Sequence, residues 1–374
     1  MSYEIHLVNL KAQLMKKILE KILNEKDTIK KIDLSGQHTL TEIPEIIKDC
    51  LQLEILNISY TEINEIPDFV FKLPKLKELN YLGCTKLKSQ PKSFFSNQSL
   101  KKLSIYISKK HILTEELKDL LSLKSIILNG EINQVPDLIY DLNNLEELEF
   151  FDTKISTVSK KIEQLKNLKK ISFWQALFLD EKPIKLKLDE IFLNISKCNN
   201  LKELNLNKNG ITEIPNNISS LKQLQKFSAG DNKLTSYPDS IYRLNKLREI
   251  DLGINQLIEV KEGIGNLKEL RILKLNSNWK NKIDTKNLFN EISQLENLEI
   301  LELWSCQSIN KIPETISELR KLKKLDLDNN LLENLPKSIL TMKQLKTLRV
   351  STNKISQTEI NEIKKHLVST NVIA

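Results

Sequence analysis

The feature of this sequence that most limits its possible folds is an internal repeat. Similar segments of 22 to 24 residues follow one another from residue 29 to about residue 356, a period typical of solenoid proteins. The clearest copy is Leu201–Leu221, and the next two copies begin at Leu224 and Leu247. A chain of 374 residues with this pattern is expected to add its core one layer at a time instead of closing one compact core.

Each position of the repeat has a physical task. With Leu201 as position 1, apolar residues fall at positions 1, 4, 6, 11, 14, 18 and 21. Positions 4 and 6, here Leu204 and Leu206, are two residues apart, so in an extended segment both side chains point to one face while positions 5 and 7 point to the other. One repeat cannot bury that apolar face alone, but parallel strands stacked side by side can.

Position 9 is asparagine in most of the regular repeats: Asn209, Asn232, Asn255, Asn278, Asn330 and Asn353. An amide can donate and accept, so we expect these side chains to bond the backbone of adjacent turns. Cys84, Cys306, Thr61 and Thr153 take the same position in other repeats. They are expected to be small buried residues, with the thiols reduced.

Proline gives an independent check of the period. Eight of the ten prolines occupy position 15: Pro44, Pro67, Pro91, Pro136, Pro215, Pro238, Pro313 and Pro336. Because proline fixes φ and has no N–H, it should end the extended segment and begin a turn of helix on the outer side.

Fourteen strand-bearing segments follow from this alignment, beginning at Ile29, Leu53, Leu76, Leu100, Leu123, Leu145, Leu168, Leu201, Leu224, Leu247, Leu270, Leu298, Leu322 and Leu345. The pattern LxxLxLxxNxLxxLPxxIxxLxx resembles the leucine-rich repeat family, specifically its intracellular Ras-group subclass and bacterial relatives. The resemblance implies an α/β solenoid, a right-handed superhelix shaped as a horseshoe or arc with a concave parallel β-sheet and about fourteen repeats. For function it implies an interaction surface without shared chemistry.

Two repeats are longer than the others and have added residues after position 9. The additions are residues 177–187, followed by the amphipathic stretch Leu188–Ile195, and residues 279–287. They either reach over the rim of the strands and join the binding site, or they lengthen the helices on the outer face.

The two ends of a stacked array expose apolar core and need caps. Apolar residues recur at helical spacing over residues 3–25, which predicts an N-terminal helical cap over residues 1–28. The array then covers residues 29–356. Ser356 is expected to begin a helix through Ile360, Ile363 and Leu367, in a C-terminal cap over residues 357–374.

The sequence has no GxGxxG, GxxxxGK[ST], HExxH or GxSxG motif. Its four cysteines lie far apart with no CxxC pair, so neither a zinc site nor a disulfide framework is indicated. We therefore expect no enzyme activity, no cofactor and no metal. Without a secretory signal or a run of 18 uncharged apolar residues, the chain is expected to be cytoplasmic.

A binding site is predicted from position 7, whose side chains are not needed for the core. Only 6% of the residues are aromatic, yet Tyr106, Phe151 and Trp174 fall in one row over four successive strands, and strands about 4.8 Å apart would place Phe151 beside Trp174. Exposed aromatic side chains often provide binding hot spots, with polar groups as a rim. The predicted partner-binding residues are Tyr106, Phe151, Asp152, Trp174, Gln175, Asn207, Asp231 and Trp304.

These residues favour a scaffold that binds another protein on the concave sheet face, with no small-molecule substrate. One alternative is that the rings only pack on each other and stiffen the sheet. A second is binding of nucleic acid or another polyanion by lysines at positions 2 and 3, for which the formal charge of +8 is modest support. The lysines considered are Lys101, Lys102, Lys169, Lys170, Lys323 and Lys324.

Overall fold

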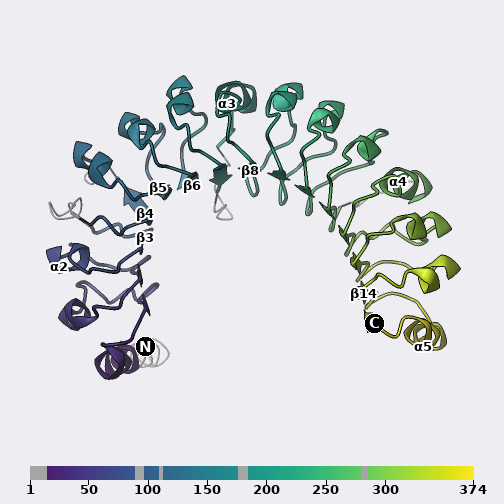
Figure 1. Ribbon diagram of the computed structural model, residues 1–374, viewed down its shortest axis with the longest axis horizontal. Coiled ribbons are helices and arrows are strands. Elements are labelled where there is room, and N and C mark those ends of the chain that lie inside the picture. The colour runs from purple at the N-terminus through teal and green to yellow at the C-terminus, as the bar shows by residue number, and fades with distance from the viewer. Residues whose placement is uncertain (1–14, 89–96, 109–112, 176–183, 279–284) are drawn as a thin grey trace, which may run out of the picture. The chain divides into compact units, whose positions relative to one another are not determined.

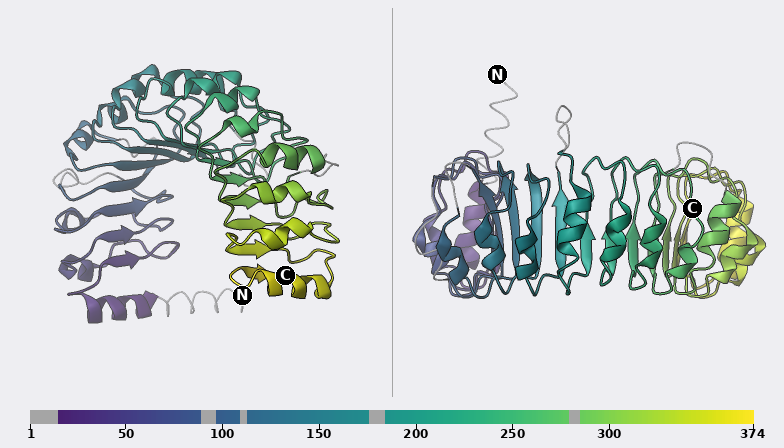
Figure 2. Two further views of the ribbon diagram at one scale, coloured as in Figure 1. Left: turned by 45° about the vertical axis from the view of Figure 1, so that its right-hand side comes forward. Right: turned by 90° about the horizontal axis from the view of Figure 1, so that it is seen from above.

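The repeats form a regular series of short strands and helical segments. The computed structural model describes residues 15–88, 97–108, 113–175, 184–278 and 285–374. They belong to two compact units, Met1–Leu168 and Lys169–Ala374. In both units each repeat supplies a strand, a turn and, in most repeats, a helical segment, and the helical segments lie on the opposite side of the layer from the strands (Figures 1 and 2).

The described residues of the first unit form six strands: β1 (Lys31–Asp33), β2 (Ile55–Asn57), β3 (Glu78–Tyr81), β4 (Lys102–Ile107), β5 (Ser125–Gly130) and β6 (Glu147–Thr153). Residues 15–25 are helical before β1. The outer segments are α2 (Asp68–Phe71) and the 3₁₀ helices η1 (Glu45–Asp49), η3 (Glu115–Asp119), η4 (Asp137–Asp141) and η5 (Lys160–Gln164).

The strands of the second unit are β7 (Lys170–Trp174), β8 (Glu203–Asn205), β9 (Lys226–Ser228), β10 (Glu249–Asp251), β11 (Ile272–Lys274), β12 (Ile300–Glu302), β13 (Lys324–Asp326), β14 (Thr347–Arg349) and β15 (Asn371–Ile373). Its α-helices are α3 (Leu188–Ile195), α4 (Thr285–Ile292) and α5 (Gln357–His366). Its 3₁₀ helices are η6 (Asn216–Ser220), η7 (Asp239–Arg243), η8 (Ile264–Asn266), η9 (Glu314–Glu318) and η10 (Lys337–Thr341).

The core is built from positions 4 and 6, as predicted. Within each unit neighbouring strands pair in parallel, and the register places position 4 beside position 4, as in Leu56 with Leu79 and Leu204 with Phe227. These side chains are fully buried. We call the other side of the strands, which carries positions 3, 5, 7 and 8, the open strand face.

The prolines at position 15 begin the outer segments, which confirms their predicted role. Pro44, Pro215 and Pro336 directly precede η1, η6 and η10. The carbonyl of Pro44 accepts a hydrogen bond from the N–H of Ile47 at 3.1 Å, and the other two prolines do the same three residues on. Most of these segments are single 3₁₀ turns because each repeat has only a few residues before its chain must return to the next strand. Pro91 lies outside the described residues.

The asparagines at position 9 form the predicted ladder. The amide of Asn232 donates to the carbonyl of Leu206 in the preceding repeat at 2.9 Å and accepts from the N–H of Ile211 at 3.0 Å. Asn255, Asn278, Asn330 and Asn353 follow the same pattern of donation to the preceding repeat. This arrangement satisfies loop groups that burial removes from water.

Cysteine and threonine at position 9 form only some of the hydrogen bonds that asparagine forms there. Cys84 and Thr61 both donate to the carbonyl of Ile58. The Cys306 thiol lies 3.5 Å from the carbonyl of Leu275, and the backbone N–H of Cys306 donates to the Asn330 side chain at 2.9 Å. All four cysteines are buried free thiols. Burial raises the pKa of the Cys306 thiol to about 12, so it stays protonated.

The longer repeats carry longer outer helices in their described parts. The amphipathic stretch Leu188–Ile195 is the α-helix α3, which agrees with the alternative of a lengthened outer helix, and α4 takes the same place in the other long repeat. Residues 176–183 and 279–284 lie outside the described part, so the proposed reach of these additions over the strands stays a prediction. At the C-terminal end, Ser356 Oγ accepts from the N–H of Glu359 at 3.2 Å and begins α5.

Candidate functional site

The residue at position 8 turns the chain away from the sheet through a left-handed backbone conformation. Among the residues that the structure describes, nine other than glycine have a φ of 51° to 59°, and all nine occupy position 8: Tyr60, Asp152, Lys208, Asp231, Ile254, Ser277, Ser305, Asn329 and Thr352. Gly36, Gly83 and Gly130 do the same in three other repeats. The turn therefore fixes where the side chains of positions 7 and 8 leave the open strand face.

In the first unit, Tyr106 and Phe151 are half-buried on the open strand face. The Tyr106 ring lies against Gly130, where an added Cβ would come within 3.0 Å of its Cε2 atom. Between the two rings, Asn129 donates to the carbonyl of Phe151 at 2.8 Å and accepts from the N–H of Gly83 at 3.0 Å. This buried amide therefore ties the backbone of Phe151 to that of Gly83.

Asp152 follows Phe151 in the left-handed turn, with φ 51°. Its charge is close enough to Tyr60 to add to the effect of burial, and together they raise the pKa of that phenol. Tyr60 is 44% exposed and its ring covers Gly83. The open strand face of this unit thus carries the aromatic side chains of Tyr60, Tyr106 and Phe151 and the carboxylate of Asp152. The sequence pattern predicted all of these except Tyr60.

In the second unit, four predicted or flanking residues come together at the ends of β7, β8 and β9. The Lys208 ammonium lies 5.4 Å from the centroid of the Trp174 ring and 3.7 Å from the Asp231 carboxylate. Asn207, beside Lys208, accepts from the N–H of Gly230 at 2.7 Å. A cation over a half-exposed indole, itself paired with a carboxylate, is a compact polar and aromatic surface.

Gln175 has a different environment from its neighbour Trp174. It is 7% exposed, and its amide exchanges two hydrogen bonds with the backbone of Ile184, at 2.8 and 3.1 Å. These contacts use the side chain to fix the chain where it returns toward α3. Phe151 and Trp174 belong to different units, so the expected contact of their rings stays a prediction.

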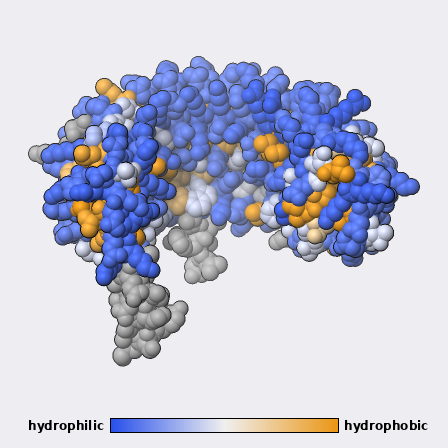
Figure 3. Space-filling view, turned by 60° about the horizontal axis from the view of Figure 1, so that its bottom comes forward, coloured by the Kyte–Doolittle hydropathy of each residue, from blue (hydrophilic) through white to orange (hydrophobic). Residues whose placement is uncertain are grey.

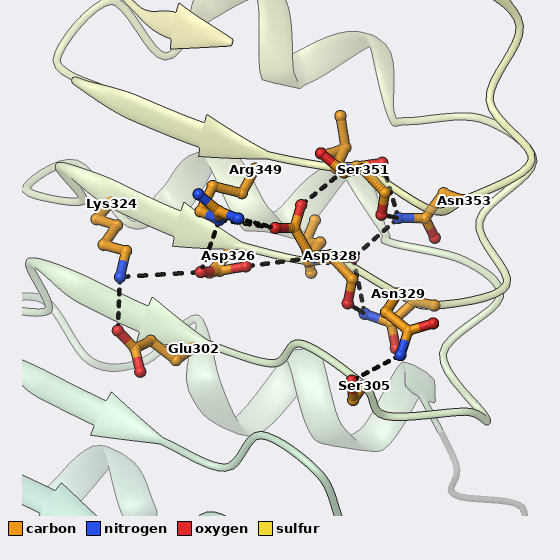
Figure 4. A network of polar contacts seen from close by, with 12 residues as sticks. Glu302, Ser305, Lys324, Asp326, Asp328, Asn329, Arg349, Ser351 and Asn353 are labelled. Atoms are coloured by element: carbon orange, nitrogen blue, oxygen red, sulfur yellow. Dashed lines mark hydrogen bonds and ion pairs between the residues drawn. The ribbon is translucent and has the colours of Figure 1, made fainter. Parts of the chain in front are cut away.

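Trp304 lies further along the second unit, half-buried on the open strand face. Its carbonyl accepts from the N–H of Ser277 at 2.8 Å, and Ser305 after it accepts from the Asn329 amide at 2.7 Å. Figure 4 shows a network of polar and charged side chains from β12, β13 and β14 and from the turns after them. Asp328 accepts from the Nε of Arg349 at 2.7 Å, and its other oxygen accepts from the N–H of Ser351 at 2.7 Å.

The lysines considered for polyanion binding are partly neutralised by acidic neighbours. Lys323 lies 2.6 Å from Glu299, and Lys324 lies 2.7 Å from Glu302. Lys102 is 3.9 Å from Glu78. Such pairs reduce the positive potential that a phosphate backbone would meet on these strands.

Within the described residues, no group of three or more histidine, cysteine or acidic side chains has a geometry that could hold a metal ion. In that same part of the chain, no helix has both the length and the apolar character needed to cross a bilayer. What the described residues do present on the open strand face is aromatic and paired charged side chains, as at Trp174, Lys208 and Asp231.

Sequence reasoning missed Tyr60 and Ile254, both exposed at position 8. The prediction rests on the aromatic row at position 7 and names position-8 residues only as a polar rim, in Asp152, Gln175 and Asp231. The signal was present, because position 8 is glycine, aspartate or asparagine in Gly36, Gly83, Asp231 and Asn329, residue types that favour left-handed turns. It would have indicated that position 8 is the corner from which side chains project.

Comparison with known proteins agrees with this architecture. Residues 185–308 match a family model described as a leucine-rich repeat region, and residues 296–355 match one described as leucine rich repeat. A volume-regulated anion channel subunit of Mus musculus is 29% identical over 163 residues, which are 43% of this chain and 17% of the channel subunit. The chain therefore matches less than a fifth of that relative's length.

Solved structures extend the likeness over the whole array. An LRR protein of Leptospira interrogans is 26% identical with a TM-score of 0.56, covering 95% of this chain and 98% of that chain. A chain of the Toll–Spätzle complex of Drosophila is 21% identical with a TM-score of 0.55, covering 86% of this chain and 48% of that chain. The repeat pattern, the parallel strands and the asparagine ladder lead to the same assignment, and the chain is a leucine-rich repeat protein.

Proposed function

We propose that this chain is a non-catalytic scaffold that binds another protein through the open strand face. The observation that carries the proposal is the placement of Tyr106, Phe151, Trp174 and Trp304, all half-buried on the face that the core does not use. Aromatic side chains offer large contact areas at low entropic cost and frequently act as hot spots. Apolar groups on this largely hydrophilic protein gather in patches (Figure 3).

The surroundings of these rings support recognition more than simple packing. Trp174 carries Lys208 over its face, and Lys208 is paired with Asp231, so aromatic and charged groups are presented together. Asp152 follows Phe151 directly, in the left-handed turn of its own repeat. A polar rim around an aromatic centre is the usual composition of a protein interface. At the level of the fold, the Toll–Spätzle complex gives an example of a leucine-rich repeat array in a complex with a protein ligand.

The first test is the removal of two aromatic side chains. We expect the double variant Phe151→Ala and Trp174→Ala to keep the circular dichroism and melting temperature of the wild type within a few degrees but to lose its specific partners. The measurement is quantitative mass spectrometry of proteins captured from the source cell by the wild-type and variant chains. Each truncation of a hot spot should weaken binding by about 2 kcal/mol or more.

The matched control is Phe69→Ala, which truncates a half-buried ring on α2, away from the open strand face. It should capture the same proteins as the wild type. If the double variant retains every partner that the wild type captures, the proposed binding face is wrong.

The location proposed for this scaffold is the cytoplasm. All four cysteines are buried free thiols, which suits a reducing compartment.

Polyanion binding is the alternative function, and the ion pairs of Lys102, Lys323 and Lys324 weigh against it.

A further inference from the structure

The open strand face of β10 to β14, which we call the β10–β14 surface, carries apolar side chains that the core does not use. Ile272 and Ile300 are paired neighbours at the starts of β11 and β12, and both are half-buried. Trp304 stands beyond the other end of β12, and Ile254 at the turn after β10 is 48% exposed. Exposed apolar groups gathered on one face of a soluble protein are typical of an interaction surface.

Ile254 adopts an energetically unfavourable backbone conformation for an isoleucine. Its φ is 55°, a left-handed conformation that a β-branched side chain adopts only with strain. Eight other described residues that are not glycine adopt this left-handed turn, and seven of them are polar; the eighth is Tyr60. A large apolar group that is both strained and exposed contributes little to folding, and backbone strain of this kind is concentrated at functional sites.

Between these apolar groups runs a band of charged side chains in which carboxylates outnumber cations. The acidic residues are Glu249, Asp251, Glu302, Asp326 and Asp328, and the basic ones are Lys274, Lys324 and Arg349. Figure 4 shows the part of this band on β12 to β14.

Each cation of the band is shared between two carboxylates. Lys324 lies 2.7 Å from Glu302 and 3.8 Å from Asp326. Arg349 lies 3.2 Å from Asp326 and also pairs with Asp328. In the same way, the Lys274 ammonium lies 3.3 Å from the carboxylate of Glu249 and 3.7 Å from that of Asp251, both on β10.

The excess negative charge is partly removed from water. Burial is the main cause that raises the pKa of Asp251 and of Asp326, and other carboxylates nearby raise it further. A carboxylate in this condition is stabilised by an additional cation. The chain as a whole carries +8, so this negative band is a local property and is complementary to a basic ligand.

We propose that the β10–β14 surface docks an extended segment of a partner protein in which lysine or arginine is flanked by apolar side chains. The basic group meets the carboxylate band near Asp251 and Glu302, and the apolar groups meet Ile272 and Ile300 on one side and Trp304 and Ile254 on the other. Five strands about 4.8 Å apart span roughly 19 Å, the length of about six extended residues. The proposal rests on the proposed function and names the ligand chemistry of one part of the face.

The test uses the full chain and a phage-displayed library of random peptides about twelve residues long. Selection on the wild-type protein should enrich peptides that are rich in lysine or arginine together with apolar residues. A selected peptide, synthesised with a fluorescent label, should bind at least about tenfold more weakly to the double variant Asp251→Asn and Glu302→Gln, which corresponds to about 1.4 kcal/mol. Trp304→Ala should have a similar effect.

The substitutions are chosen to leave the fold in place. Asp251 Oδ1 accepts from the N–H of Gly253 at 3.1 Å, and an asparagine oxygen can accept the same bond. The matched control removes two carboxylates from the outer side, with Asp239→Asn and Glu296→Gln, both of which are exposed. This control should bind the peptide as the wild type does, and the peptide with its basic residues replaced by glutamine should bind neither.

The inference is overturned if no peptide is enriched, if the enriched peptides are neutral or acidic, or if the Asp251→Asn and Glu302→Gln variant binds them unchanged. Preference for a single-stranded RNA over the selected peptides would also overturn it. Failure of this inference is distinguishable from failure of the proposed function, because cellular partners that depend on Phe151 and Trp174 would still be captured by the wild-type chain.

Discussion

At the scale of the residue, position 8 shows how one backbone conformation serves many side chains. Asp152, Lys208 and Ser305 all adopt the same left-handed turn, although they differ in charge and size. Asparagine, aspartate and glycine adopt it with the least cost. Ile254 and Tyr60 adopt it at a greater cost, so their presence there requires an explanation other than the stability of the turn.

The first residue-scale prediction concerns this cost. We expect Ile254→Asn to raise the free energy of unfolding by about 1 kcal/mol, because asparagine tolerates the left-handed conformation that strains isoleucine. Chemical denaturation followed by circular dichroism measures the change. The same variant should bind the peptides selected on the β10–β14 surface more weakly, since it loses an apolar contact.

A matched control is available in the same repeat. Ile258 is 53% exposed and is not among the residues with positive φ, so Ile258→Asn should leave stability nearly unchanged. Equal effects of the two substitutions would show that exposure, and not backbone conformation, decides the result.

At the scale of the element, most of the local structure could be predicted from the sequence because each element has a residue that fixes its boundary. Pro44 and Pro215 precede outer helices, and Asn232 bonds two repeats together. These roles follow from the chemistry of one side chain. In two repeats the residue at position 8, Ile107 or Gln175, does not adopt the left-handed turn, and the sequence did not predict this. For Gln175 the cause is visible only in the fold, where its side chain bonds the backbone of Ile184.

The candidate site was predicted less completely than the fold. The sequence identified Trp174 and Asp231 as outward side chains, but the contacts through Lys208 depend on how neighbouring turns are placed in space. The sequence also did not reveal that the β10–β14 surface is complementary in charge to a basic ligand. The residues of that surface come from five strands that whole repeats separate in the sequence.

The element-scale prediction concerns the last helix. Ser356 Oγ accepts from the N–H of Glu359 at the start of α5, and Glu359 in turn accepts from the N–H of Leu335 in the repeat before it at 2.7 Å. We expect Ser356→Ala to lower the free energy of unfolding by about 1 kcal/mol, the usual value for the loss of such a cap.

Thermal unfolding followed by circular dichroism is the measurement. Thr358→Ala, at an exposed position in the first turn of the same helix, should have a much smaller effect. If the melting temperatures of the two variants fall together, the cap does not contribute to stability in the way its geometry indicates.

At the scale of the whole molecule, the distribution of charge matters more than its sum. The chain has 57 basic and 49 acidic residues, but the β10–β14 surface has more carboxylates than cations, and many lysines elsewhere are paired with acids. A net charge spread in this way keeps a protein soluble and does not create a continuous path for a phosphate backbone.

The molecule-scale prediction follows from this distribution. Fluorescence anisotropy with a single-stranded RNA of about 20 nucleotides should give only weak binding at physiological salt, with Kd in the non-specific range of about 10⁻⁶ to 10⁻⁴ M. Neutralising two carboxylates of the band with Asp251→Asn and Glu302→Gln should strengthen the binding of this RNA slightly. Nanomolar binding by the wild-type chain would instead favour the polyanion alternative.

The asparagine ladder has a practical consequence for protein engineering. It fixes the course of the chain after each strand through backbone bonds, as Asn255 does with Ala229 and Leu234, and it does not use the side chains of positions 3, 5 and 7. A combinatorial library that varies position 3, and varies positions 5 and 7 only where their side chains do not bond the backbone as those of Asp251 and Asn129 do, would therefore retain one backbone while changing its ligand. The array is suited to directed selection of new binders in which each repeat is exchanged independently.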